Sequence, residues 1–144
     1  MRWALRALLL AAVILTVFAL LPRRLGEPIP GPEVRAVAAI RTIHTAETQY
    51  YSQFNRYATS LAELGPPASG LAHASAADLI GNDLASGVKQ GYVFTVTANR
   101  GGYIIQAMPQ VFHTGGRTFY SDRTMVVHEH YGPEPATPQD PESK

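Results

Sequence analysis

The sequence predicts an α+β fold in which a long N-terminal amphipathic helix packs on a four-stranded antiparallel sheet, preceded by a single transmembrane helix. Three observations predict it. Apolar side chains recur at helical spacing over residues 32–57, residues 91–130 contain two β-rich hairpins, and residues 7–21 are apolar and uncharged. These three patterns are typical of an amphipathic helix, of antiparallel strands and of a membrane span respectively.

The long helix is predicted over residues 32–57, PEVRAVAAIRTIHTAETQYYSQFNRY. Pro32 suits the first turn because the N–H that it lacks would have no intrahelical partner there. Two rows of residues three or four apart share one side of the helix: Val37, Ile40, His44, Glu47, Tyr51 and Phe54, and Ala36, Ile40, Ile43, Glu47, Tyr50 and Phe54. So wide an apolar face must be covered, and we expect Ile40, Ile43 and Phe54 to be buried against the sheet.

The N-terminus is predicted to belong to a membrane. Arg2 and Arg6 precede the apolar run ALLLAAVILTVFALL, and Trp3 suits a membrane interface. A signal anchor over residues 1–21 is the first interpretation, since a span needs about 20 apolar residues. A signal peptide cleaved after Ala19 is the alternative. Both interpretations place the rest of the chain outside the cytoplasm.

The rest of the chain divides into a linker, a domain and a tail. Residues 22–32 contain four prolines and two glycines, so we expect a Pro-rich linker. A short helical turn is predicted over 59–64 and a short helix over 76–84. Strands 91–98 and 103–108 form the first hairpin, and 117–121 and 124–130 form the second. The globular domain therefore spans 33–131, and residues 132–144, with four prolines, are predicted to be a disordered tail.

Composition and charge exclude several functions. There is no cysteine, so neither a disulfide framework nor thiolate chemistry is available. Residues 1–24 contain four arginines and no acid, which leaves eight basic and eleven acidic residues in the remainder, a formal charge of −3. This charge gives no basic stripe of the kind that nucleic-acid binding requires.

Glu47 is the most unusual residue of the helix because it lies on the apolar face. A buried carboxylate needs donors, and we expect backbone N–H groups of the loop after Phe54 to supply them. Arg41 and Arg56 are not three or four residues from Glu47, so they are poor partners on the helix. We therefore assign Glu47 a structural role and identify no catalytic residue.

Other candidate sites are weaker. His128 and His130 share one face of a strand and, with His113 or His44, could hold a metal, although two ligands are too few for a tight zinc site. Ser121, Asp122 and His128 offer the residue types of a catalytic triad, but neighbours on a turn cannot point as a triad demands. Phe112 has no periodic reason to be buried, which makes it a possible partner contact.

Four segments resemble type IV pilin-like proteins and type II secretion pseudopilins. Residues 39–47 (AIRTIHTAE) with Tyr50 and Tyr51 resemble the globular half of the family's long helix, and 57–65 (YATSLAELG) the segment after it. Residues 87–95 (GVKQGYVFT) look like the entry to the family's sheet, and 116–122 (GRTFYSD) the hairpin that closes it. The family's leader motif is absent: Gly26 is followed by Glu-Pro-Ile-Pro, so we expect no cleavage by prepilin peptidase.

The resemblance implies a non-enzymatic, membrane-anchored protein with a structural or accessory role in a type IV pilus or a type II secretion type system. With the predicted anchor, it implies a single-pass protein of the bacterial inner membrane whose globular domain is periplasmic or extracellular. Its partners would be the membrane and other proteins, or further copies of the chain. The residues identify no cofactor, metal, nucleic acid or small-molecule substrate. The alternative is a stand-alone periplasmic or cell-surface binding module with a pilin-like fold.

Overall fold

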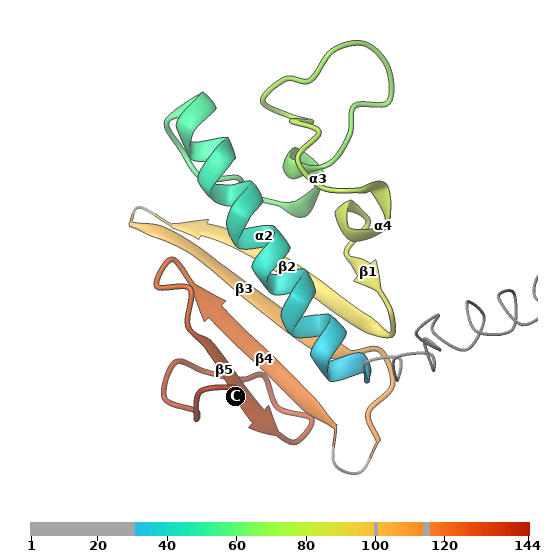
Figure 1. Cartoon of the computed structure of the whole chain (residues 1–144), viewed down its shortest axis with the longest axis vertical. Helices are drawn as coiled ribbons and strands as arrows, with labels where there is room; N and C mark the ends of the chain where they lie inside the picture. The colour runs from blue at the N-terminus through green and yellow to red at the C-terminus, as the bar shows by residue number, and fades with distance from the viewer. Residues whose placement is uncertain (1–30, 100, 114–115) are drawn as a thin grey trace, which may run out of the picture.

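A computed structural model describes residues 31–99, 101–113 and 116–144 of the chain. One long helix, α2, lies across one face of an antiparallel sheet, and two short helices lie next to each other near its first strand (Figure 1). The elements are α2 (Pro32–Phe54), α3 (Leu61–Leu64), α4 (Asn82–Ala85), β1 (Val88–Lys89), β2 (Tyr92–Asn99), β3 (Gly102–Pro109), β4 (Arg117–Asp122) and β5 (Val127–Tyr131). The strands follow one another in sequence order, so the sheet is a simple meander.

The ends of α2 follow from its sequence. Pro32 occupies the first turn after the N-cap Gly31, and Glu33 stands near the positive end of the helix dipole. Asn55 ends the helix in the left-handed conformation, where its N–H donates to the carbonyl of Tyr51. The helix therefore ends close to the predicted position.

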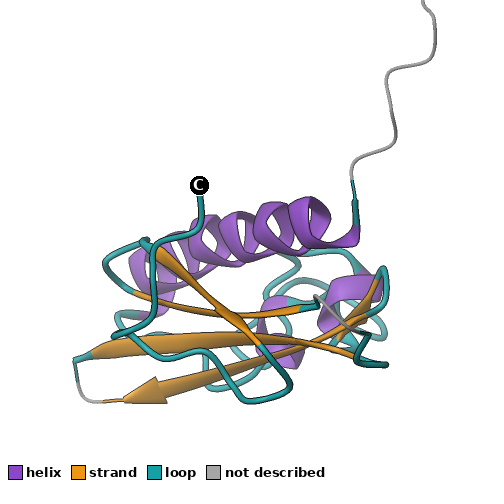
Figure 2. Cartoon of the chain, turned by 90° about the horizontal axis from the view of Figure 1, so that it is seen from below, coloured by secondary structure: helices purple, strands orange, loops and turns teal. Residues whose placement is uncertain are grey.

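The core lies between α2 and the sheet, which Figure 2 shows edge-on. Exposure alternates along β2 as expected of a strand with one buried face, and Phe94 of β2, Ala107 of β3 and Phe119 of β4 lie side by side beneath the helix. Ile40 and Ile43 are fully buried, so the prediction for these two side chains is confirmed.

Phe54 differs from the prediction. It is only partly buried, because it lies in the last turn of α2, and its ring packs on Tyr50 with 4.6 Å between ring centroids. The apolar rows thus identify the correct face of the helix. They extend one turn beyond the part of that face that the sheet covers.

The prediction of a four-stranded sheet is wrong, because the sheet has five strands. The missed strand is β1, where Val88 pairs with Val93 and Lys89 with Tyr92. Two residues are too few to show the alternation by which a strand is predicted. The predicted helix 76–84 is likewise replaced by the four-residue α4, which begins after Gly81.

The tail was predicted to be disordered, and this prediction is also wrong. Residues 132–144 pack against β4 and β5, and the side chain of Ala136 is 1% exposed. The low apolar content of the segment suggested that it could not order itself. It is ordered instead by the backbone groups of β5 and by polar side chains that accept or donate hydrogen bonds.

The membrane prediction also requires correction. The predicted anchor 1–21 and linker 22–30 lie outside the described residues. Across 31–99, 101–113 and 116–144, no helix is long and apolar enough to span a bilayer. This finding conflicts with the predicted location as a single-pass inner-membrane protein, and that location does not enter the proposals below.

Candidate functional site

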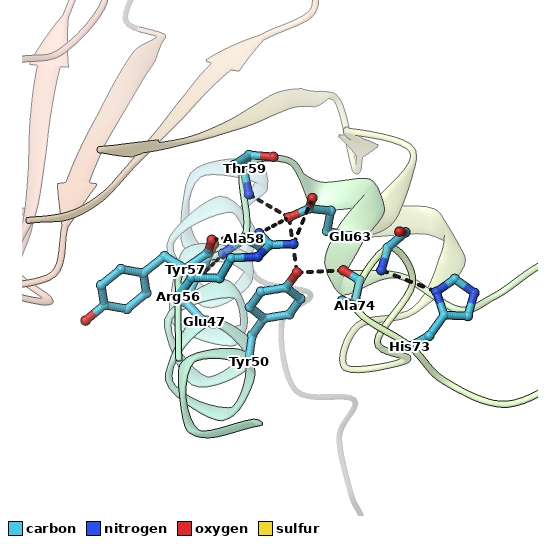
Figure 3. Close-up of polar contacts among 10 residues, drawn as sticks. Glu47, Tyr50, Arg56, Tyr57, Ala58, Thr59, Glu63, His73 and Ala74 are labelled. Carbon is cyan, nitrogen blue, oxygen red and sulfur yellow. Dashed lines mark hydrogen bonds and ion pairs between the residues drawn. The ribbon is translucent and has the colours of Figure 1, made fainter. Parts of the chain in front are cut away.

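Glu47 is the one fully buried carboxylate in the described part of the protein. It lies on the covered face of α2 with none of its surface exposed. Its Oε2 accepts a hydrogen bond from the backbone N–H of Ala58 at 2.9 Å, which is the kind of donor predicted from the sequence (Figure 3). Its Oε1 has no hydrogen-bond partner among the described residues. Burial raises the pKa of Glu47 to about 7, against the smaller opposing effect of the Ala58 N–H.

A second carboxylate, Glu63 of α3, joins the end of the long helix to the loop. Its Oε2 accepts hydrogen bonds from the Thr59 N–H at 2.9 Å and from Arg56 at 3.0 Å, with Tyr50 Oη at 3.3 Å (Figure 3). The hydroxyl of Tyr50 also lies 2.6 Å from the carbonyl oxygen of Ala74. Arg56 therefore pairs with Glu63 and leaves Glu47 without an ion pair among the described residues.

A capping box at this position is formed only in part. Ser60 is the N-cap of α3 but makes no side-chain cap bond, while Glu63 reaches back to Thr59. The capping pattern was the one signal in the sequence that pointed to Glu63. Its contacts with Arg56 and Tyr50 depend on the path of the loop, and no sequence pattern predicts them.

His44 joins α2 to the sheet through a buried polar network. Its Nδ1 lies 2.6 Å from the hydroxyl of Tyr103 and its Nε2 lies 2.8 Å from Oγ of Ser121. Ser121 donates its own proton to the carbonyl of Val126, so Nε2 carries the proton that Ser121 accepts. Burial lowers the pKa of His44 and so favours the neutral ring, in which Nδ1 accepts the proton of the Tyr103 hydroxyl.

The network does not have the arrangement of a nucleophilic site. Ser121 is fully buried, and its hydroxyl proton is already donated to a backbone carbonyl. Asp122 instead binds Thr124, and His128 binds the carbonyl of Asp140, so the triad residue types are not brought together. The contacts of His44 with Tyr103 and Ser121 instead hold α2 in position on the sheet.

His128 and His130 are directed towards the tail. Nδ1 of His128 lies 2.7 Å from the Asp140 carbonyl, and Nδ1 of His130 lies 2.9 Å from Oδ1 of Asp140. His44 is buried on the covered face of α2, where it binds Tyr103 and Ser121 instead. In the described ranges no three His, Cys, Asp or Glu side chains gather as a metal site would require.

Phe112 lies beside an apolar cavity at the N-terminal end of α2. Its side chain is 40% exposed, and Val111 next to it is exposed as well. The cavity has a volume of about 400 Å³. Its lining includes Pro32, Glu33, Gly91, Tyr92, Pro109, Val111 and His113. Val111 and Phe112 therefore form exposed apolar surface near the N-terminal end of α2. The contact of Phe112 with a partner stays a prediction.

A polar groove at the other end of α2 was not predicted. Tyr51 and Tyr57 stack at its wall with ring centroids 4.7 Å apart, and Asn55, Arg56 and Arg123 complete much of the lining. The spacing of Tyr51 placed it on the apolar face of the helix, yet Tyr51 is exposed because the end of α2 extends past the sheet. The sequence does not show how far the sheet extends along α2, so it could not predict that Tyr51 is exposed.

No family model matches the chain, and comparison with curated proteins and with solved structures found no significant similarity.

Proposed function

We propose that this chain is a non-enzymatic pilin-like protein with a structural or accessory role in a type IV pilus or a type II secretion type system. The observation that carries the proposal is the long helix α2 laid across an antiparallel meander. The positions of the four segments that resemble the family support the proposal. Residues 39–47 with Tyr50 and Tyr51 lie in α2, 57–65 leads into and through α3, 87–95 spans β1 and the start of β2, and 116–122 contains β4.

The buried polar groups support a structural role. His44 and Glu47 both bind groups within their own fold, to the sheet and to the loop respectively. Such contacts hold the helix in one position on the sheet, which a subunit needs in order to present a fixed surface to its neighbours. The exposed Phe112 and Val111 supply an apolar contact of the kind found at the centre of protein interfaces.

Shear fractionation of cells that express the chain tests this function. We expect the protein in the sheared filament fraction by immunoblot, and we expect Phe112→Ala to reduce its share there. Thr45→Ala, on the exposed side of α2, is the matched control and should leave that share unchanged. A protein that stays entirely with the cell bodies, in cells whose filaments and secretion do not change when the gene is deleted, would contradict the proposal.

A second candidate is a stand-alone binding module with the same fold. The groove beside Tyr51 and Tyr57 favours it, because the exposed ring of Tyr51, packed on the partly buried Tyr57, combines apolar surface with the hydrogen-bonding groups of Asn55 and Arg123 nearby. Such a module would remain outside the filament fraction. Tyr51→Ala would then abolish its retention on the surface that it binds, whereas Phe112→Ala would have no effect.

A further inference from the structure

The C-terminal tail, residues 132–144, completes the sheet at its last strand. β5 is an edge strand, and the tail covers it on two sides (Figure 1). Along the edge, the N–H of Glu129 donates to the carbonyl of Pro141 and the N–H of Ser143 donates to the carbonyl of Val127. On the face turned away from α2, Ala136 is buried and the hydroxyl of Thr118 donates to the carbonyl of Glu134. Groups that would otherwise lie on an open edge are therefore paired.

A charged clasp fixes the tail in register. Nδ1 of His130 lies 2.9 Å from Oδ1 of Asp140, and Nε2 lies 3.6 Å from Oε2 of Glu134. The other oxygen of Asp140 accepts from the N–H and the hydroxyl of Thr137. The tail is thus bound to β5 through His130 and to β4 through the hydroxyl of Thr118.

The connection between β5 and the tail is short. Gly132 follows the last residue of β5 directly and has a φ of 153°, and a Cβ at this position would lie 2.6 Å from Glu134 Oε2. Pro133 and Pro135 come next. The backbone thus reverses within a few residues, through a glycine in a conformation that other residues rarely adopt. Short hinges of this kind favour exchange of the terminal segment between copies, because the open hinge has no sharp turn to maintain.

We propose that the tail is exchangeable, and that the edge of β5 binds the tail of a second copy of this chain through the contacts that it makes with its own. The occupant is set by chemistry on both sides. An extended segment must place a carboxylate on His130 and, one residue later, a free carbonyl on the N–H of Glu129, and residues 140–143 do so. Nothing is lost when these contacts form between chains, since both partners are restored in each copy. The inference goes beyond the proposed function and does not require it.

The absence of cysteine allows a direct test. His128 and Glu142 face each other across an isolated antiparallel bridge, and the bonds of their neighbours identify them as a non-hydrogen-bonded pair. Such pairs have Cα atoms about 4.5 Å apart, within the range that a disulfide spans. Full-length H128C and full-length E142C, one of them ¹⁵N-labelled, are mixed, incubated overnight and oxidised with copper phenanthroline. The disulfide-linked heterodimer is then measured by mass spectrometry.

The control mixture replaces H128C with S69C, whose cysteine is exposed on the loop between α3 and α4, on the side of the molecule opposite β5 (Figure 1), so that it meets the tail only by collision. We expect the H128C–E142C heterodimer to form at least ~10-fold faster than the control heterodimer, because a docked tail holds the two sulfurs together. Equal rates in the two mixtures would overturn the proposal. So would a double variant, H128C/E142C, that forms its disulfide within one chain while the mixture gives no heterodimer above the control.

A second measurement leaves His128 in place. E142C carrying a nitroxide is mixed with ¹⁵N-labelled wild-type chain, and the amide signals of the labelled chain are recorded by NMR. Exchange should broaden the signals of Val127 and Glu129 and leave that of Ser69, on the loop between α3 and α4, unchanged. Uniform or absent broadening would contradict exchange. A chain that exchanges tails but is missing from the sheared filaments would retain this inference and lose the proposed function.

Discussion

Glu47 combines full burial with a single described hydrogen bond, and this makes the stability of the protein depend on pH. Its pKa in the folded state is about 7, above its ordinary value of 4.5. The folded state therefore holds this proton more tightly than the unfolded state. The contribution is fully present below pH 4.5 and is lost as the pH rises through about 7.

Glu47→Gln should remove this dependence, because glutamine is neutral at every pH and keeps an acceptor for the Ala58 N–H. We expect the variant to match the wild type near pH 4 and to exceed its unfolding free energy by ~3 kcal/mol at pH 8. Urea unfolding of both proteins across this range measures the difference. Parallel curves would contradict the charge argument. Glu47→Ala should instead lose ~1–3 kcal/mol at pH 4, since it leaves the donor unmet.

The network of His44 leads to a separate prediction. Tyr103→Phe keeps the ring but removes the hydroxyl 2.6 Å from Nδ1, so a buried acceptor loses its donor. We expect a loss of ~1–3 kcal/mol in unfolding free energy. Tyr131→Phe is the control, because that tyrosine is exposed and its hydroxyl makes only a 3.5 Å contact. Equal melting temperatures for the two variants would show that the buried network contributes no stability.

At the scale of the elements, the covered face of α2 stays fully buried as far as Tyr50 and is only partly buried in the last turn. Ile40 is fully enclosed, while Phe54 lies in that last turn, where its ring packs on Tyr50. We therefore expect Ile40→Ala to cost ~2–5 kcal/mol as a cavity in the core. Phe54→Ala should cost less, ~1–2 kcal/mol, since only part of its area leaves water on folding. Thermal or urea unfolding of both variants tests the order, and a larger loss at Phe54 would reverse it.

The elements also show where prediction from sequence succeeds. The periodicity of α2 predicted the burial of Ile40, Ile43 and Glu47, because each side chain's position on a helix follows from its number in the chain. Glu63 with Arg56, and the pair Tyr51–Tyr57, depend on where a loop and the end of a helix come to lie. Such contacts join residues through the path of the backbone, and no repeat in the sequence encodes them.

At the scale of the whole molecule, the tail shows the limit of reasoning from composition. A segment with four prolines has too little apolar surface to fold alone. It is ordered here because β5 provides an edge and His130 provides a charge partner, and both belong to another part of the chain. In the sequence, His128 and His130 have the residue type and spacing of metal ligands. Nothing in the sequence indicates that both imidazoles bind Asp140 instead.

The clasp makes the order of the tail depend on pH. The carboxylate of Asp140 raises the pKa of His130, and Glu134 adds to the effect. The hydrogen bond from His130 in turn lowers the pKa of Asp140 to about 2, with Thr137 contributing. The other groups facing the ring are His128 on the same strand and the neutral Thr118 across from it on β4. The His130 contribution is present below pH 6.5 and is lost as the pH rises through its raised value. That of Asp140 is present above pH 3.8 and is lost as the pH falls through about 2.

The tail should therefore be held most firmly between about pH 4 and pH 6.5. Hydrogen exchange at the amides of Glu129 and Ser143, which bond across the edge, reports this directly after correction for the intrinsic rates. We expect their protection to fall as the pH rises from 6 to 8 (approximate limits set by the histidine). His130→Gln should flatten this change, and His73→Gln, on the loop between α3 and α4, should not. A wild-type profile that stays flat, while the amides of α2 behave as before, would show that the charge on His130 does not hold the tail.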